Sequence, residues 1–197
     1  MYLVTNKRLE KMKKVLNTRQ YTLRVFMDYV YSNHNLSAIV RTCDAVNVGK
    51  LYYRHQKKVK LNNEITMGAH KWILYEYVED IEKFYKEIKQ EGYQIIVTLL
   101  EEDSIDFREV DYTKPTLIVL GNEVDGVSKD TLKYADKKVI IPMYGMSQSL
   151  NVSVANGVIL YEAQRQRKLK GMYNNPSLPK ELIEKTLKKW AYEDLIK

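Results

Sequence analysis

Short apolar stretches alternate with amphipathic stretches along most of the chain. Apolar and polar side chains alternate over residues 21–30, as in a half-buried strand, and residues 93–100 and 116–120 are apolar runs of strand length. Between these runs, apolar residues recur at helical spacing over residues 36–48 and 80–90. Strands that alternate with helices favour βαβ units, so the pattern predicts an α/β fold with a mostly parallel sheet flanked by helices.

The same pattern predicts further elements and divides the chain into three parts. Additional strands are predicted at 51–54, 72–78 and 139–142, and additional helices at 128–134, 150–167, 6–17 and beyond Pro179. We therefore expect an N-terminal basic helical extension over 1–20, a central domain over 21–170 and a C-terminal helical extension over 171–197. The apolar stripe around Leu187 and Trp190 has two possible partners, the body of the protein or a second copy of the chain.

Composition excludes only a few classes of function. The net charge of +7 and the pI of about 9.2 favour a polyanionic partner, although many proteins are mildly basic. A lone cysteine, Cys43, excludes an intrachain disulfide, and we expect no membrane span, no secretory signal and a cytoplasmic location. His34, His55 and His70 lack metal-ligand spacing, so we expect no metal, and no GxGxxG follows the first strand.

Three segments combine polar side chains with an apolar framework. In residues 141–155 an apolar strand end runs into a Gly-containing loop and then a helix, where Ser149 and Asn151 can cap free N–H groups that suit a polar or anionic ligand. Asn35 stands at another predicted helix start, within residues 33–45, and Arg41 lies on the polar face of that helix. The third segment, residues 120–123, reads Leu-Gly-Asn-Glu at the end of an apolar run.

In this order the three segments resemble the motifs of the SPOUT class of RNA methyltransferases, and within it the TrmH (SpoU) family of ribose 2′-O-methyltransferases. The resemblance covers roughly residues 21–171, and the run over residues 106–115 is similar to the branch that modifies guanosine 18 of tRNA. It implies a SPOUT methyltransferase domain with a C-terminal trefoil knot, which no hydrophobic pattern would indicate. It also implies S-adenosyl-L-methionine as cofactor and a homodimer.

Methyl transfer to a ribose hydroxyl requires a cofactor cradle, an RNA anchor and a route for the proton. The resemblance assigns the cradle to residues that are mostly apolar or glycine and can present backbone groups to an adenine ring. These cofactor-binding candidates are Thr98, Leu100, Gly121, Ile141, Met143 and Leu150. Tyr144 places an aromatic ring where the family commonly has an aliphatic residue, which affects adenine packing and not the class of reaction.

The resemblance assigns the catalytic pocket to Asn35, Arg41, Glu123, Ser149 and Asn151. Arg41 matches the family residue that is thought essential for activating the nucleophile. A guanidinium holds its proton beyond about pH 12. Arg41 therefore acts either as a strongly perturbed base or as an electrostatic stabiliser of the forming alkoxide, and we favour the second role. Glu123 is expected to position neighbouring groups, and capping alone is a sufficient role for Ser149.

Basic residues gather near both ends of the chain, where the family's extensions are thought to hold tRNA. The RNA-binding candidates are Lys7, Arg8, Lys11, Arg19, Arg165, Arg167 and Lys168. Phosphate contacts of this kind supply affinity and little sequence choice. The lysines of residues 6–17 are open to two interpretations, an RNA-gripping helix or the solvated face of a helix that packs on the body.

We therefore predict methylation of the ribose 2′-hydroxyl of guanosine 18 in the tRNA D-loop. The nearer alternative is the same reaction on the tRNA wobble nucleotide or on ribosomal RNA. The more distant alternative is a non-catalytic RNA-binding module that kept the fold. Whether all tRNAs or a subset are accepted is left open.

Overall fold

A computed structural model describes residues 4–55, 61, 63–101, 103–122 and 124–193 of the 197-residue chain. The strands are β1 (Gln20–Asp28), β2 (Val48–Arg54), β3 (Tyr75–Tyr77), β4 (Gln94–Thr98), β5 (Ile105–Asp106), β6 (Thr116–Leu120) and β7 (Lys137–Ile140). The helices are α1 (Asn6–Asn17), α2 (Asn33–Val46), α3 (Asn63–Thr66), α4 (Ile81–Gln90), α5 (Lys129–Leu132), α6 (Val152–Leu169) and α7 (Lys180–Glu193). Two 3-10 turns, η1 (Ala69–Trp72) and η2 (Phe107–Glu109), complete the described elements.

The seven strands form one sheet in the order β3-β2-β1-β6-β4-β7-β5, and every neighbouring pair is parallel. The predicted α/β class with a mostly parallel sheet is therefore confirmed. The strand expected over residues 72–78 shrinks to the three residues of β3: Trp72 still belongs to η1, and residues 73, 74 and 78 lie outside both elements. The pattern gave no sign of the two-residue strand β5. The trefoil knot stays a prediction.

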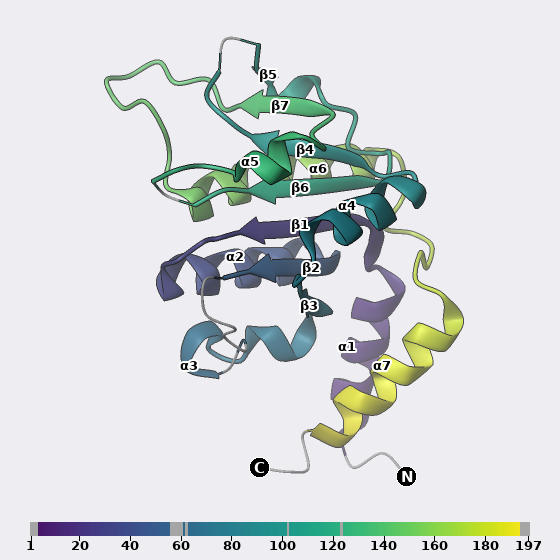
Figure 1. Cartoon of the computed structure of the whole chain (residues 1–197). Helices are drawn as coiled ribbons and strands as arrows, with labels where there is room; N and C mark the ends of the chain where they lie inside the picture. Colours follow the sequence, from purple (N-terminus) through teal and green to yellow (C-terminus); the bar gives the residue numbers. More distant parts are fainter. Residues whose placement is uncertain (1–3, 56–60, 62, 102, 123, 194–197) are drawn as a thin grey trace.

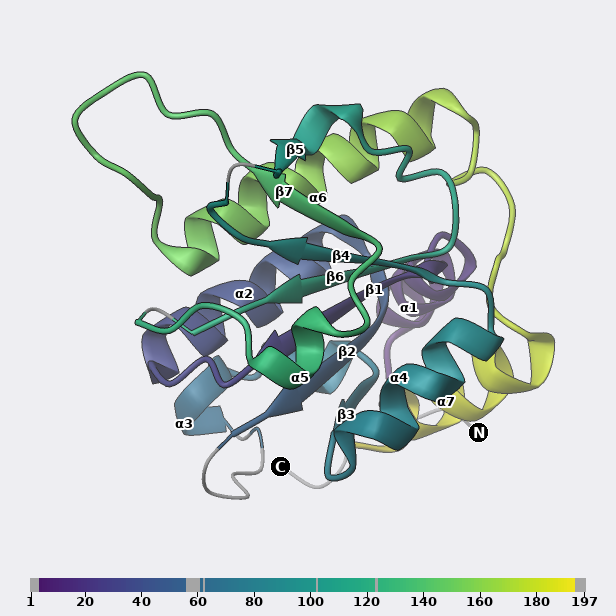
Figure 2. The same cartoon turned by 45° about the horizontal axis from the view of Figure 1, so that its top comes forward.

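Helices cover both faces of the sheet (Figures 1 and 2). On one face α2 and α6 pack side by side, and their buried residues, among them Ile39, Cys43 and Ile159, join the larger apolar cluster. On the other face α4 contributes Phe84 and Tyr85 to a second cluster that contains several aromatic rings. Cys43 is completely buried in the larger cluster, and this burial raises the pKa of its thiol.

The helices at the two ends of the chain form a unit of their own. α1 and α7 lie side by side (Figure 1), and Met12, Leu16, Leu178 and Trp190 form a third apolar cluster between them. Leu187 packs against the same cluster. The apolar stripe of the last helix therefore packs within this chain, which decides between the two partners that the sequence left open.

The start and end of α2 differ from the predicted bounds. Ser32 caps the helix, accepting a hydrogen bond from the N–H of Asn35, so Asn35 lies inside the first turn and not at its cap. Asn47 ends the helix in the left-handed region with φ of 64°, so the helix stops at Val46 and not at residue 48. Gly49, the nearest glycine, belongs to β2, where an added Cβ would lie 2.5 Å from the carbonyl oxygen of Gln20.

Two of the predicted RNA contacts, Arg19 and Arg167, are wrong, because both side chains are fully buried. The guanidinium of Arg167 donates to the carbonyl oxygens of Tyr112, Thr22 and Lys114 at 2.9–3.1 Å, and to the side chains of Gln20 and Thr22. Arg19 donates to the carbonyl oxygens of Val48 and Trp72. Burial lowers the pKa of each arginine to about 10.

Arg167 thus joins the end of α6 to the start of β1 and to the segment before β6. Arg167→Ala should lower the free energy of unfolding by about 3–5 kcal/mol, because several buried acceptors lose a charged donor. Arg165→Ala is the matched control. Arg165 is exposed and pairs only with Glu162 on the same helix, so its effect should stay within about 1 kcal/mol. Urea denaturation of both variants measures the difference, and equal small effects would contradict the structural role of Arg167.

Candidate active site

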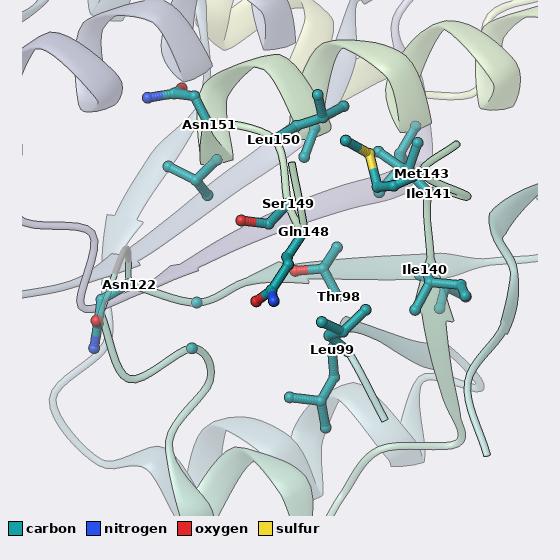
Figure 3. Close-up of a pocket in the computed structure, with 17 residues that line it drawn as sticks. Thr98, Leu99, Asn122, Ile140, Ile141, Met143, Gln148, Ser149, Leu150 and Asn151 are labelled. Carbon is teal, nitrogen blue, oxygen red and sulfur yellow. The ribbon is translucent and has the colours of Figure 1, made fainter. Parts of the chain in front are cut away.

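A cavity of about 380 Å³ opens at the carboxyl ends of β4, β6 and β7 (Figure 3). Ligand sites of α/β proteins lie at this edge of the sheet, and small-molecule sites have volumes of about 300–1,000 Å³. All six predicted cofactor-binding residues line the cavity: Thr98, Leu100, Gly121, Ile141, Met143 and Leu150. Ser149 and Asn151 line it as well. The structure therefore brings together segments that lie up to 53 positions apart in the sequence.

One wall of the cavity is the tight turn after β6. The backbones of Asn122 and Gly126 exchange two hydrogen bonds, of 2.9 and 3.2 Å, and the side chain of Asn122 accepts from the N–H groups of Val124 and Asp125. The turn folds back on Gly121 so closely that an added Cβ there would lie 2.1–2.4 Å from the backbone of Gly126 and Val127. Only glycine fits at this position.

Asp28 holds this turn from below, and sequence reasoning did not single it out. Its side chain is fully buried at the end of β1, and its Oδ2 atom accepts from the N–H of Ser128 at 2.9 Å and from the hydroxyl of Thr131 at 2.7 Å. Ser128 caps α5 and follows the turn closely. The sequence showed Asp28 only as a polar position of an alternating strand, because nothing in the pattern reveals that β1 is buried on both faces.

The opposite wall comes from the loop between β7 and α6, which projects from the body (Figures 1 and 2). Tyr144 and Met146 are fully exposed near its tip, and Gln148 returns to the cavity. Ser149 does not cap α6, contrary to the role open to it in the sequence. The cap is Asn151, whose Oδ1 atom accepts from the N–H of Ser153 at 2.9 Å.

A hydrogen bond between two asparagines connects the first turns of α2 and α6. The side-chain amide of Asn151 donates to the side-chain oxygen of Asn35 at 3.1 Å, and Asn35 is buried. The side chain of Asn151 thus accepts a hydrogen bond from a free N–H group at the start of its own helix. It also donates a hydrogen bond to a residue 116 positions away. Of the predicted catalytic residues, the structure brings these two into direct contact, beside the cavity.

Comparison with known proteins explains this arrangement. Residues 22–161 match the SpoU rRNA Methylase family, and residues 165–197 match the family of SpoU rRNA methylase C-terminal regions. The chain belongs to the SpoU methylase family. The tRNA (guanosine(18)-2′-O)-methyltransferase of Aquifex aeolicus is 59% identical to it over 198 residues, which cover 100% of this chain and 94% of the relative.

Two solved structures of SpoU enzymes extend the comparison. A crystal structure of the A. aeolicus TrmH/SpoU tRNA modifying enzyme has a TM-score of 0.90 and 59% identity, with 97% of this chain and 98% of that chain covered. The SpoU methyltransferase AviRb from Streptomyces viridochromogenes, in complex with the cofactor AdoMet, has a TM-score of 0.68 and 28% identity. That match covers 78% of this chain and 60% of AviRb.

The remaining catalytic candidates of this SpoU chain lie apart from the asparagine pair. Arg41 is exposed on α2, does not line the cavity and makes no ion pair within the described residues. The intrahelical pairs with Ser37 or Asp44 that the sequence allowed are therefore not formed. Glu123 lies outside the described residues.

The exposed RNA-binding candidates form two groups. Lys7, Arg8 and Lys11 lie on α1, and the Arg8 guanidinium sits 5.4 Å from the ring centre of Trp72. Arg165 and Lys168 lie on α6. Their contacts with RNA stay predictions. Within the described part of the chain, no helix is both long enough and apolar enough to cross a bilayer, and no three potential metal ligands gather.

Two glycines of the cavity walls allow a direct test of this geometry. Gly121→Ala should lower the free energy of unfolding by about 1–3 kcal/mol, because the turn after β6 has to open to admit the new methyl group. Gly145→Ala, in the projecting loop, meets nothing within 4 Å and should stay within about 0.5 kcal/mol. Thermal unfolding of the two variants measures the difference. Equal melting temperatures would show that the turn is not tightly packed.

Proposed function

We propose that this protein methylates the ribose 2′-hydroxyl of guanosine 18 in the tRNA D-loop, with S-adenosyl-L-methionine as methyl donor. The observation that carries this function is the cavity at the sheet edge, which two of the three SpoU motifs line and to which the third is joined by the hydrogen bond between Asn151 and Asn35. The choice of tRNA and of guanosine 18 is supported by the A. aeolicus relative, which has that activity in its name and matches the whole chain.

The residues around the cavity suit this cofactor. Leu99, Ile141 and Leu150 offer apolar walls to an adenine ring, and the backbone at Gly121 offers polar groups without a side chain in the way. The side chain of Gln148 adds an amide that can bond the amino-acid part. S-adenosyl-L-methionine supplies a methyl group on a sulfonium, which is already a good leaving group. The chain therefore has to hold and activate the ribose hydroxyl.

Arg41 is the residue that we assign to the ribose hydroxyl or its phosphate. A guanidinium makes two parallel hydrogen bonds to a phosphate, and its charge stabilises a forming alkoxide. Asn35 and Asn151 act as positioning residues, because their hydrogen bond fixes the helix that carries Arg41 against the helix that borders the cavity. By family resemblance Glu123 supports Asn35 and Arg41, and Ser149 contacts the ligand from the loop.

We further propose that two copies form the working enzyme. In this arrangement Arg41, which does not line the cavity of its own chain, serves the site of the second copy. Val154 and Tyr161, seven residues apart on one face of α6, are 50% and 52% exposed and offer an apolar surface for it. The helical pair of α1 and α7 is not part of this surface on α6. It provides the extension that holds tRNA. A tRNA-modifying enzyme of this kind acts in the cytoplasm.

Transfer of a radiolabelled methyl group to an unmodified tRNA transcript tests the reaction and its target together. The matched substrate is the same transcript with guanosine 18 replaced by adenosine. We expect label on the first transcript and none on the second. Equal label on both would move the target elsewhere, for example to the wobble nucleotide. Label on ribosomal RNA alone would replace tRNA as the substrate, and no label on either RNA would contradict the enzymatic function.

Arg41→Ala separates binding from turnover. The variant should bind S-adenosylhomocysteine with unchanged affinity by calorimetry, since Arg41 does not line the cavity. Its methyl-transfer rate should fall by about 10²–10³-fold, the loss typical of a removed transition-state donor. Lys133→Ala is the control, because Lys133 is exposed and pairs with Asp130 on α5. Weakened cofactor binding by a folded Arg41→Ala protein would instead place Arg41 in the cofactor cradle.

Tyr161→Glu tests the dimer. A charge at the centre of the apolar surface of α6 should shift the protein from a dimer to the 23.2 kDa monomer, measured by sedimentation velocity. Tyr75→Glu on the edge strand β3 makes the same change on another surface and should leave the mass unchanged. A wild-type protein that sediments as a monomer, or a dimer that survives Tyr161→Glu, would overturn this interface.

A further inference from the structure

A second cavity, of about 300 Å³, lies between α1, α7, η1 and the C-terminal part of α2. Its lining contains two indole rings, two cationic side chains and one carboxylate, a composition unlike that of the cofactor cavity. These residues are Arg8, Lys11, Asp44, Trp72 and Trp190, with Met12 and Val15 completing the wall. Arg8 and Lys11 are RNA-binding candidates from the sequence, whereas neither the sequence nor the reaction assigned a binding role to Asp44, Trp72 or Trp190.

Both tryptophans of the chain are gathered here. The rings of Trp72 and Trp190 meet edge to face, with centres 5.5 Å apart, and the chain positions them from elements that are 118 residues apart. Arginines flank the pair: Arg8 lies over Trp72, and Arg19 lies 5.6 Å from the centre of Trp190. Aromatic rings beside guanidinium groups are the surroundings in which proteins stack nucleic-acid bases.

Asp44 supplies the cavity with a carboxylate that has acceptor capacity to spare. Within the described part of the chain no N–H or O–H group donates a hydrogen bond to its side chain. Burial raises its pKa, against the opposing charges of Arg19 and Lys11. The side-chain oxygens of Asp44 are partly exposed at the cavity, so they are open to N–H donors of a ligand.

Lys11 adds a cation at the same opening. It is exposed on α1, lines the cavity and makes no ion pair within the described residues. Together with Arg8 it provides positive charge above the carboxylate, as a phosphate on a bound nucleotide would require. The cavity thus offers a ring-binding wall, an acceptor for base N–H groups and a cationic rim.

We propose that this second cavity binds a guanosine nucleotide of the substrate RNA, separate from the nucleoside that is methylated. Guanine alone among the four bases carries two adjacent N–H donors on its Watson–Crick edge, the pattern that one carboxylate accepts with both oxygens. Asp44 reads this edge, the partly exposed ring of Trp72 contacts the base, and Lys11 contacts the phosphate, while Trp190 supports Trp72 from the apolar cluster. Because the guanosine comes from tRNA, the role of the site rests on the proposed function.

The position of Asp44 connects the two cavities. Asp44 and Asn35 stand nine residues apart on α2, about 14 Å along the helix axis, with Arg41 exposed between them. Asn35 borders the cofactor cavity through Asn151, whereas Asp44 lines the second cavity. One rigid helix therefore carries a group for each cavity, which fixes the distance between the two nucleotides that the enzyme holds.

Intrinsic fluorescence reports directly on this cavity, because Trp72 and Trp190 are the only tryptophans of the chain. The full-length protein is saturated with S-adenosylhomocysteine to occupy the first cavity and is then titrated with guanosine 5′-monophosphate or adenosine 5′-monophosphate. We expect a saturable change in emission with the guanine nucleotide. Its dissociation constant should be about 10-fold or more below that of the adenine nucleotide, which turns a lone pair toward the carboxylate.

Two substitutions separate the contributions of base and phosphate. Asp44→Asn should abolish the preference for guanine over adenine. Lys11→Ala should weaken both nucleotides by the same factor and leave the binding of guanosine, which has no phosphate, unchanged. Lys13→Ala removes the same charge from α1 outside the cavity and should change neither quantity, since Lys13 pairs with Glu10. The comparison of nucleotides on the wild-type protein does not depend on how well any variant folds.

Absence of a saturable response to guanosine 5′-monophosphate would overturn the second site, as would a guanine preference that survives Asp44→Asn. Methyl transfer to tRNA, measured on the same preparation, distinguishes this failure from a failure of the proposed function. Transfer without a guanine response refutes the site alone. A guanine response without transfer to tRNA supports the site as a nucleotide pocket and refutes the assigned reaction.

Discussion

All seven strands run in the same direction, and this constraint determines where the chemistry of the protein lies. The carboxyl ends of β4, β6 and β7 meet at one edge, so the residues that follow each strand converge there although they are far apart in sequence. The hydrogen bond between Asn35 and Asn151 depends on the same alignment, because it needs α2 and α6 to begin at this edge. The sheet therefore provides the position, and short polar segments provide the chemistry.

Buried arginines connect the two ends of the chain to this sheet. Arg167 donates to carbonyl oxygens from β1 and from the segment before β6, and Arg19 donates to carbonyl oxygens of β2 and η1. Because Arg167 fixes the C-terminal end of α6, the whole helix is held in place. Its N-terminal end, which Asn151 caps, therefore stays beside the cavity. The helical pair of α1 and α7 is anchored beside Trp72 by ring contacts, because Trp190 of α7 meets Trp72 edge to face and the guanidinium of Arg19 lies over the Trp190 ring.

The sequence predicted the fold class and the main strands, because local periodicity carries that information. The six cofactor candidates came from the family resemblance, and the structure places all six around one cavity, while their binding of a cofactor stays a prediction. The sequence-based prediction failed for Arg19 and Arg167, since basic residues near the chain ends look alike whether they face solvent or buried carbonyl groups. Asp28 was missed for a related reason: its acceptor role depends on Ser128 and Thr131, 100 or more positions away. Helix starts were also displaced, as at α2, where several polar residues compete for the cap.

The single cysteine makes the core of this protein accessible to kinetic measurement. Cys43 is completely buried between α2 and the sheet, and its thiol is held in the protonated, unreactive form. A thiol reagent therefore modifies the native protein only when α2 moves away from the sheet. The rate of that reaction measures how often the helix that carries Asn35 and Arg41 detaches, and each bound ligand that clamps this helix slows it.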